Sequence, residues 1–164
     1  MMRLCRDAAD ADIPVGFLGS TPAVLAALID RLVSMFPDLT VAYADSFLFR
    51  PATSQEDAEM TRAVTESGAR ILFVGLGCPK QERFIDEHLG RIPCVMLGVG
   101  AAFDFISGNK PIAPHWMAVA GLEWLFRLMM EPRRLWRRYF VQNTRFVRRL
   151  SLHRRRNPRT DSTP

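Results

Sequence analysis

Two glycine-containing segments of the chain have the composition of phosphate-binding loops. In the first, the apolar run 71–74 ends at Gly75 and Gly77, and Pro79 and Lys80 then open a predicted helix. The free backbone N–H groups and the dipole of a helix N-terminus attract anions, and glycine lets the backbone approach them closely. A tight strand-to-helix turn without a ligand explains the same residues, and this segment alone does not separate the two interpretations.

The second segment follows another short apolar run and contains Gly98, Gly100, Phe103 and Asp104. Asp104 could accept hydrogen bonds from a sugar or ribose hydroxyl, or act as a base. A carboxylate at this place also suits a helix cap, which is the alternative interpretation. The segment therefore adds a second glycine loop with one candidate polar group.

Lys80 and Gln81 stand directly after the first glycine loop. Lys80 could neutralise a phosphate, and the Gln81 amide can both donate and accept hydrogen bonds, although both are also ordinary exposed helix residues. The acidic pair Asp10 and Asp12 lies away from both glycine loops, so we treat its spacing as chance. The three cysteines form no C-x-x-C pair, which favours a reducing compartment. We expect no metal site and no cofactor.

Strands alternating with helices must position these loops. Apolar runs bounded by glycine or proline predict short strands, and helical spacing or polar composition predicts helices between them. The predicted strands are 15–19, 40–44, 71–74 and 94–97, and the predicted helices are 22–36, 55–67 and 79–89, with a short helical segment after residue 101. This alternation predicts a Rossmann-like α/β domain over residues 1–110, with a parallel sheet that binds ligands at its carboxyl edge.

The last quarter of the 164-residue chain carries most of its arginines, and the net charge is +5. Two helices are predicted, at 117–130 and from 132 to about 150, within a basic appendage over 111–152; residues 153–164 are predicted to be disordered. The second helix has an aromatic-rich face opposite its arginines. That pattern favours an anionic membrane surface. Packing of the apolar face on the domain and nucleic-acid binding are the alternatives, and no recognised nucleic-acid motif supports the latter.

Several linked motifs resemble the WecG/TagA/CpsF glycosyltransferase family. They are Val74–Glu82 (VGLGCPKQE), Gly98–Asp104 (GVGAAFD), Ala113–Trp116 (APHW), Gly121–Leu128 and Glu131–Arg134. The resemblance runs from about residue 14 to residue 140. It implies a bacterial enzyme that moves an N-acetylmannosamine-type sugar from a UDP donor to a polyprenyl-pyrophosphate-linked sugar, with inversion and without a metal. The products would feed teichoic acid, common-antigen or capsular and exopolysaccharide synthesis.

The resemblance also assigns roles to residues. Gln81 would act in catalysis near the donor sugar or pyrophosphate. The donor-binding residues would be Gly75, Gly77, Pro79, Lys80, Gly98, Gly100, Phe103 and Asp104, with Asp104 near the ribose or base. The lipid phosphate would be held by Arg127, Arg133, Arg134, Arg137 and Arg138. The enzyme would be cytoplasmic and peripheral at the inner face of the membrane, with no nucleic-acid partner; a homo-oligomer is left open.

Two differences from the family pattern affect this expectation. Ile112 stands where family members usually have an arginine, which removes one phosphate contact. Family members also carry a segment before the first strand, with threonine and asparagine donor contacts and the aspartate thought to be the general base. The resemblance implies that this chain starts after that segment and lacks the general base: either the start codon is misassigned, the gene is truncated, or a separate chain supplies the missing part. A catalytically silent protein that binds UDP and membrane is therefore the runner-up, followed by an α/β module with a nucleic-acid-binding tail.

Overall fold

The computed structural model describes residues 1–46, 50, 52–111, 117, 119, 121, 122, 126 and 129. The chain divides into two compact units, Met1–Pro111 and Ile112–Pro164. The five phosphate-binding arginines predicted between residues 127 and 138, the helix predicted from 132 and the tail lie outside the described residues. The following description concerns the first unit.

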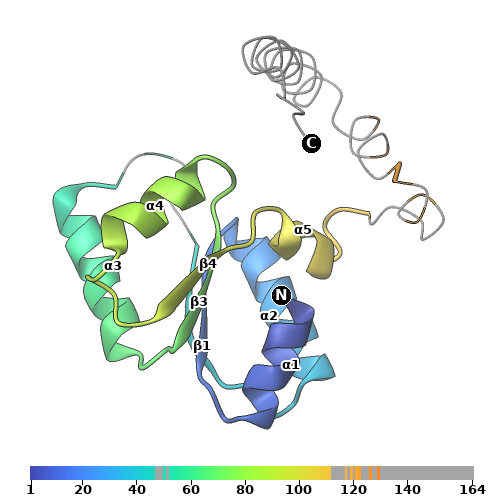
Figure 1. The fold of residues 1–164 in the computed structure, drawn as a ribbon, viewed down its shortest axis with the longest axis horizontal. Coiled ribbons are helices and arrows are strands. Elements are labelled where there is room, and N and C mark those ends of the chain that lie inside the picture. Colours follow the sequence, from blue (N-terminus) through green and yellow to red (C-terminus); the bar gives the residue numbers. More distant parts are fainter. Residues whose placement is uncertain are drawn as a thin grey trace, which may run out of the picture. The chain divides into compact units, whose positions relative to one another are not determined.

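The first unit is built on a four-stranded parallel sheet (Figure 1). Its strands are β1 (Val15–Gly19), β2 (Val41–Asp45), β3 (Ile71–Gly75) and β4 (Val95–Gly98), in the spatial order β2-β1-β3-β4. Every pairing is parallel. The predicted α/β class is confirmed, and each strand lies within one residue of its predicted bounds.

Five helices accompany the sheet: α1 (Met2–Asp10), α2 (Pro22–Met35), α3 (Ser54–Glu66), α4 (Lys80–His88) and α5 (Ala102–Ile106). Figure 1 shows α1, α2 and α5 on one side of the sheet and α3 and α4 on the other. Side-chain caps fix two helix starts. Thr21 accepts a hydrogen bond from the Val24 backbone N–H at 3.3 Å, and Thr53 forms a capping box with Glu56.

Helix α1 was not among the elements predicted from the sequence. No side-chain cap marks its start. Its buried residues are Cys5, Ala8 and Ala9, all of which are small. Since caps and large apolar residues are the local signals of a helix, α1 depends on packing against the rest of the unit. Burial also raises the pKa of the Cys5 thiol to about 11.

Alternate side chains of the central strands enter two separate cores, as the two-residue period of a strand requires. Phe17 stacks on Phe73 with ring centroids 5.4 Å apart, in the core shared with α1, α2 and α5. Leu18 packs in the other core with Val74 and Phe84, under α3 and α4. A sheet covered on both faces explains why its central strands are continuously apolar.

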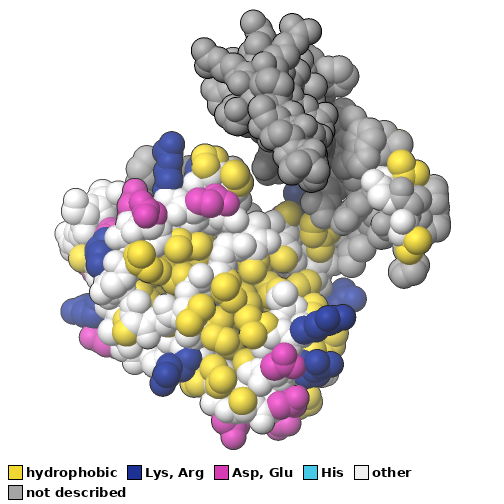
Figure 2. Space-filling view, in the orientation of Figure 1, with side chains coloured by type: hydrophobic (Ala, Val, Ile, Leu, Met, Phe, Trp, Pro, Cys, Tyr) yellow, Lys and Arg dark blue, Asp and Glu magenta, His cyan; other side chains and the backbone are white. Residues whose placement is uncertain are grey.

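β4 is an edge strand in the part of the chain that the structure describes. Val95 on this strand is 60% exposed, and Leu89 before it is 75% exposed. Figure 2 shows hydrophobic side chains gathered across the middle of the side on which Figure 1 draws β4. This edge therefore differs from the β1 and β3 interior, where the apolar side chains are buried.

Among the described residues, no helix combines the length and the hydropathy needed to span a bilayer.

Candidate functional site

The strand order reverses between β1 and β3: β2 is added on one side of β1, and β3 and β4 are added on the other. This switch point locates the candidate site. β1 leads into α2 on one side of the sheet, and β3 leads into α4 on the other (Figure 1). The two connections therefore diverge at the carboxyl ends of neighbouring strands. In open parallel sheets, ligands bind in the crevice at such a switch point.

Two glycines bring these connections into backbone contact. Gly19 pairs with Gly75 in the β1–β3 register and has a φ of +121°. A Cβ atom on Gly19 would lie 2.8 Å from both the carbonyl carbon and the oxygen of Gly75, so a side chain is excluded there. Gly19 was not among the predicted site residues. Its position at the end of a strand, two residues before the Thr21 cap, was the available signal.

Gly75 accommodates an aromatic ring as well. A Cβ atom on Gly75 would lie 2.5 Å from the Phe103 ring. Phe103 is 1% exposed and packs edge-on against Phe17, with centroids 5.9 Å apart. The predicted role of Phe103 was substrate contact, but the structure places its ring in the core. The Phe103 ring therefore packs against Gly75 and attaches α5 to the core.

We expect Gly75→Ala to lower the free energy of unfolding by about 1–3 kcal/mol, because the added methyl overlaps the Phe103 ring. Urea unfolding of the full chain measures this loss. Gly75→Ala combined with Phe103→Leu should cost less than the sum of the two single changes, since the smaller side chain gives the methyl room. Strictly additive losses would show that the two residues are not in contact.

Gln81 joins the two glycine loops. Its side chain is 8% exposed, and its Oε1 accepts a hydrogen bond from the Gly100 backbone N–H at 2.9 Å. Its Nε2 donates to Glu82 Oε1 at 3.1 Å. A Cβ atom on Gly98 would lie 2.9 Å from the Gln81 Nε2, so the amide packs directly on that glycine. The Gln81 amide thus fixes the loop after β4 against the start of α4.

The remaining predicted residues of the first loop surround the start of α4. The Cys78–Pro79 peptide bond is cis, and Pro79 is the N-cap, so α4 begins at Lys80 rather than at Pro79 as predicted. Gly77 has a φ of +74°, and its carbonyl accepts the Gln81 N–H at 3.0 Å. Lys80 is exposed. The loop is therefore closed by backbone hydrogen bonding, while the Lys80 ammonium faces solvent.

Asp104 belongs to a separate polar group on α5. Its Oδ1 accepts a hydrogen bond from Asn109 Nδ2 at 2.9 Å, and its Oδ2 lies 3.7 Å from Lys110 Nζ. The backbone carbonyl of Asp104 also accepts the Lys110 N–H at 3.0 Å. The carboxylate is therefore held by the turn that follows α5.

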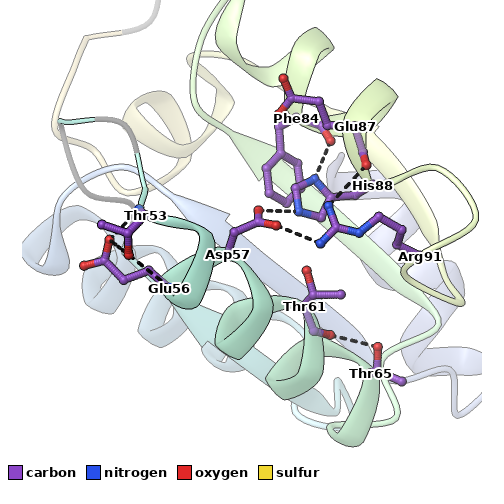
Figure 3. Close-up of polar contacts among 9 residues, drawn as sticks. All are labelled: Thr53, Glu56, Asp57, Thr61, Thr65, Phe84, Glu87, His88 and Arg91. Carbon is purple, nitrogen blue, oxygen red and sulfur yellow. Dashed lines mark hydrogen bonds and ion pairs between the residues drawn. The ribbon is translucent and has the colours of Figure 1, made fainter.

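A polar network that the sequence did not indicate joins α3 to α4 (Figure 3). His88 is 1% exposed; its Nδ1 lies 2.8 Å from the Phe84 carbonyl and its Nε2 lies 2.8 Å from Asp57 Oδ1. Arg91 donates to Asp57 Oδ2 at 2.7 Å. Burial disfavours the Asp57 carboxylate, but the hydrogen bonds and charges of Arg91 and His88 outweigh it and lower the Asp57 pKa. Both ring nitrogens of His88 therefore lie within hydrogen-bonding distance of an oxygen, one from α4 and one from α3.

A second paired carboxylate lies at the start of α3. Arg50 donates hydrogen bonds to Glu56 from both terminal guanidinium nitrogens, with Nη1 at 2.8 Å from Oε2. Hydrogen bonds from Arg50 and then from the Thr53 backbone and hydroxyl lower the pKa of Glu56 to about 2. Glu56 thus stays ionised wherever the domain is folded at ordinary pH.

Because of Glu56 and Asp57, the free energy of unfolding is expected to depend on pH in the acidic range. Their pKa values are lower in the folded than in the unfolded chain, so the stability they contribute is complete above the unfolded values near 4 and is lost as the pH falls through the folded values. We expect the urea midpoint to fall between about pH 5 and about pH 2. Glu56→Gln with Asp57→Asn should flatten this dependence. An unchanged pH profile in the double variant would contradict the assignment.

Among the described residues, no group of three or more His, Cys, Asp or Glu side chains is placed to hold a metal ion. Asp10 ends α1, and Asp12 follows it in a turn with a φ of +50°. Neither residue belongs to the carboxyl edge where the glycine loops lie.

The doubly wound parallel sheet, with glycine loops meeting at its switch point, defines a Rossmann-like α/β domain of the kind that binds ligands in that crevice. The chain belongs to the glycosyl transferase WecG/TagA/CpsF family, whose model matches residues 1–160. The predicted family is thereby confirmed.

Two relatives from Bacillus species share the name N-acetylglucosaminyldiphosphoundecaprenol N-acetyl-beta-D-mannosaminyltransferase. The one from Bacillus subtilis (strain 168) is 32% identical over 122 residues, which are 73% of this chain and 45% of the relative. The one from Bacillus spizizenii (strain ATCC 23059 / NRRL B-14472 / W23) is 35% identical over 126 residues, which are 76% of this chain and 46% of the relative. The chain therefore spans under half the length of these relatives.

Proposed function

We propose that this chain is the donor-binding part of a glycosyltransferase that moves an N-acetylmannosamine-type sugar from UDP to a polyprenyl-diphosphate-linked sugar. The observation that carries the proposal is the switch-point crevice, where Gly19 and Gly75 meet and Gln81 ties in the Gly100 loop. Family membership supplies the reaction class, and the names of the two relatives supply the acceptor and sugar. The UDP donor comes from the family resemblance.

In this proposal the UDP diphosphate lies at the glycine loops, where backbone N–H groups and the start of α4 favour negative charge. Asp104 accepts hydrogen bonds from the ribose or base. The acceptor hydroxyl attacks the anomeric carbon, its proton passes to a base outside the residues assigned above, and UDP leaves with inversion. Gln81 contributes through the placement of the Gly98–Gly100 loop beside the donor.

The arginines at 127, 133, 134, 137 and 138 complete the proposal as the lipid-phosphate contacts of a protein peripheral to the inner face of the cell membrane. Cationic side chains closing over the diphosphates would stabilise the charge that develops on the leaving group without a metal. Flotation with vesicles containing anionic lipid tests this part. Binding to neutral vesicles of equal strength, or to DNA instead of vesicles, would contradict it.

The central experiment measures donor binding and turnover separately. UDP and UDP-N-acetylmannosamine should raise the thermal midpoint, because a ligand at 100 times its Kd stabilises the folded state by about 2.7 kcal/mol. Transfer is then measured with a polyprenyl-diphosphate-linked N-acetylglucosamine acceptor, without metal and with EDTA. ADP and GDP are the matched control ligands. A chain that is stabilised by none of the uridine ligands would overturn the proposal.

The same assay decides the second candidate, a catalytically silent protein that binds UDP and membrane. What favours it is coverage: the chain matches less than half of each relative. Stabilisation by UDP together with no transfer would establish it. Transfer that EDTA abolishes and added metal restores would contradict the metal-independent mechanism.

A further inference from the structure

A cavity of about 1340 Å³ lies between α3, α4 and the carboxyl ends of β1 and β2. Leu18 and Asp45 line it at the strand ends, and Lys80 and Arg83 line it from α4. Ligand pockets commonly measure about 300–1,000 Å³, so the space is sufficient for a nucleotide-sized molecule. The cavity touches the first glycine loop at Leu76.

Most charged side chains that line this cavity already have partners. Arg50 pairs with Glu56, and Asp57 binds both His88 and Arg91 (Figure 3). The first contact joins the chain before α3 to the first turn of that helix, and the second joins α3 to α4 and the residues that follow it. These paired side chains form part of the cavity wall. Because their charges neutralise one another, they attract a bound ion only weakly.

Two further acidic groups accept hydrogen bonds within the wall. Glu59 accepts from Gln55 Nε2 at 2.9 Å, and Asp45 accepts from the Tyr43 hydroxyl at 3.4 Å. The Tyr43 pKa is raised by burial and by Asp45, so its hydroxyl keeps the proton that it donates. Glu59 lies on α3 and Asp45 ends β2, so neither belongs to α4.

Lys80 and Arg83 are the lining cations to which the described structure gives no carboxylate partner. They stand three residues apart, which places them on one face of α4. Both lie in the first half of that helix, where the dipole favours an anion. Glu87, the remaining unpaired acid of α4 in the cavity lining, lies in the last turn.

We propose that Lys80 and Arg83 bind a diphosphate group in this cavity. The planar guanidinium of Arg83 can donate two parallel hydrogen bonds to phosphate oxygens, and the Lys80 ammonium adds a compact charge beside the helix start. Arg83 was interpreted from sequence as a surface residue, so its role is new. The source of the diphosphate rests on the proposed function, which offers the UDP donor and the polyprenyl-diphosphate acceptor.

The test is calorimetric titration of the full chain with three probes: inorganic pyrophosphate, UDP and a short-chain polyprenyl diphosphate. The variants are Arg83→Gln, Lys80→Gln and the double change. Arg62→Gln is the matched control, because Arg62 is a 72%-exposed helix arginine that does not line the cavity. Circular dichroism confirms that each variant keeps the fold of the parent.

Each single change should raise the Kd for pyrophosphate at least about tenfold, as expected for the loss of one charge-assisted hydrogen bond, and the double change should abolish binding. Arg62→Gln should change the Kd by less than about twofold. If UDP binding weakens in parallel, the diphosphate belongs to the donor. If only the polyprenyl diphosphate weakens, it belongs to the acceptor. Equal loss in Arg62→Gln, or no loss in Arg83→Gln, overturns the proposal.

Failure of this proposal is distinguishable from failure of the proposed function. A chain that binds UDP and transfers sugar, but is indifferent to Lys80→Gln and Arg83→Gln, retains the function and loses the diphosphate site. A chain that binds pyrophosphate through these residues, but neither binds UDP nor transfers sugar, retains the site and loses the function.

Discussion

Replacing Asp57 with alanine is expected to lower the free energy of unfolding by about 2–3 kcal/mol, because it leaves the buried His88 ring nitrogen and the Arg91 guanidinium without their shared acceptor. The expected loss is below the 3–5 kcal/mol typical of a fully buried pair, since Asp57 is 29% exposed and Arg91 is 45% exposed. Urea unfolding of the full chain at pH 7, followed by circular dichroism, gives the value.

Two further variants separate the network from general damage to α3. Glu59→Ala removes an exposed carboxylate from the same helix and should change stability by no more than about 0.5 kcal/mol. His88→Phe in the Asp57→Ala background should recover part of the loss. The phenyl ring keeps the stacking on Phe84, whose ring centroid is 4.1 Å from that of His88, and leaves no buried ring nitrogen without a partner. Equal losses in Asp57→Ala and Glu59→Ala would refute the special role of Asp57.

The second large effect concerns Gln81. Gln81→Ala removes the acceptor of the partly buried Gly100 N–H and the side chain that packs on Gly98. An unpaired buried donor costs about 1–3 kcal/mol, and part of that cost should appear in the loop that would contact the donor. We therefore expect the Kd for UDP to rise about tenfold or more in calorimetric titration.

A reciprocal double change decides whether Gln81 positions the loop or contacts the substrate itself. Gln81→Glu together with Glu82→Gln preserves an acceptor for the Gly100 N–H and restores an amide donor between the two side chains. Rescue of UDP binding in this double variant is the result expected of a positioning residue. If binding stays as weak as in Gln81→Ala, the amide itself is needed at the ligand.

The sequence was sufficient for the sheet because each strand carries its own local signals. The run 71–74 is apolar and stops at glycine, and the helices after β1 and β2 begin with threonine caps at Thr21 and Thr53. Such signals lie within a few residues of the element they define. α1 has neither a side-chain cap nor large buried residues, so the same procedure missed it.

The candidate site was predicted less well because its contacts join distant parts of the chain. The Gln81 amide meets Gly100, and His88 meets Asp57 on another helix; neither pairing follows from spacing. Phe103 illustrates a further limit. The family resemblance implied contact with substrate, but an apolar ring beside a glycine also fits a core contact, which is what the structure shows.

The position of β1 inside the sheet also sets an order of events for folding. Val15 pairs with Val41 on one side and with Ile71 on the other, and the second pairing spans about twice the length of chain. Each doubling of a closed loop adds an entropic cost of about 0.6 kcal/mol, so the β1–α2–β2 unit should form before β3 docks. The glycine contact at the crevice, which needs β3, would then be acquired late. Ligand-binding competence should accordingly appear after most of the secondary structure during refolding.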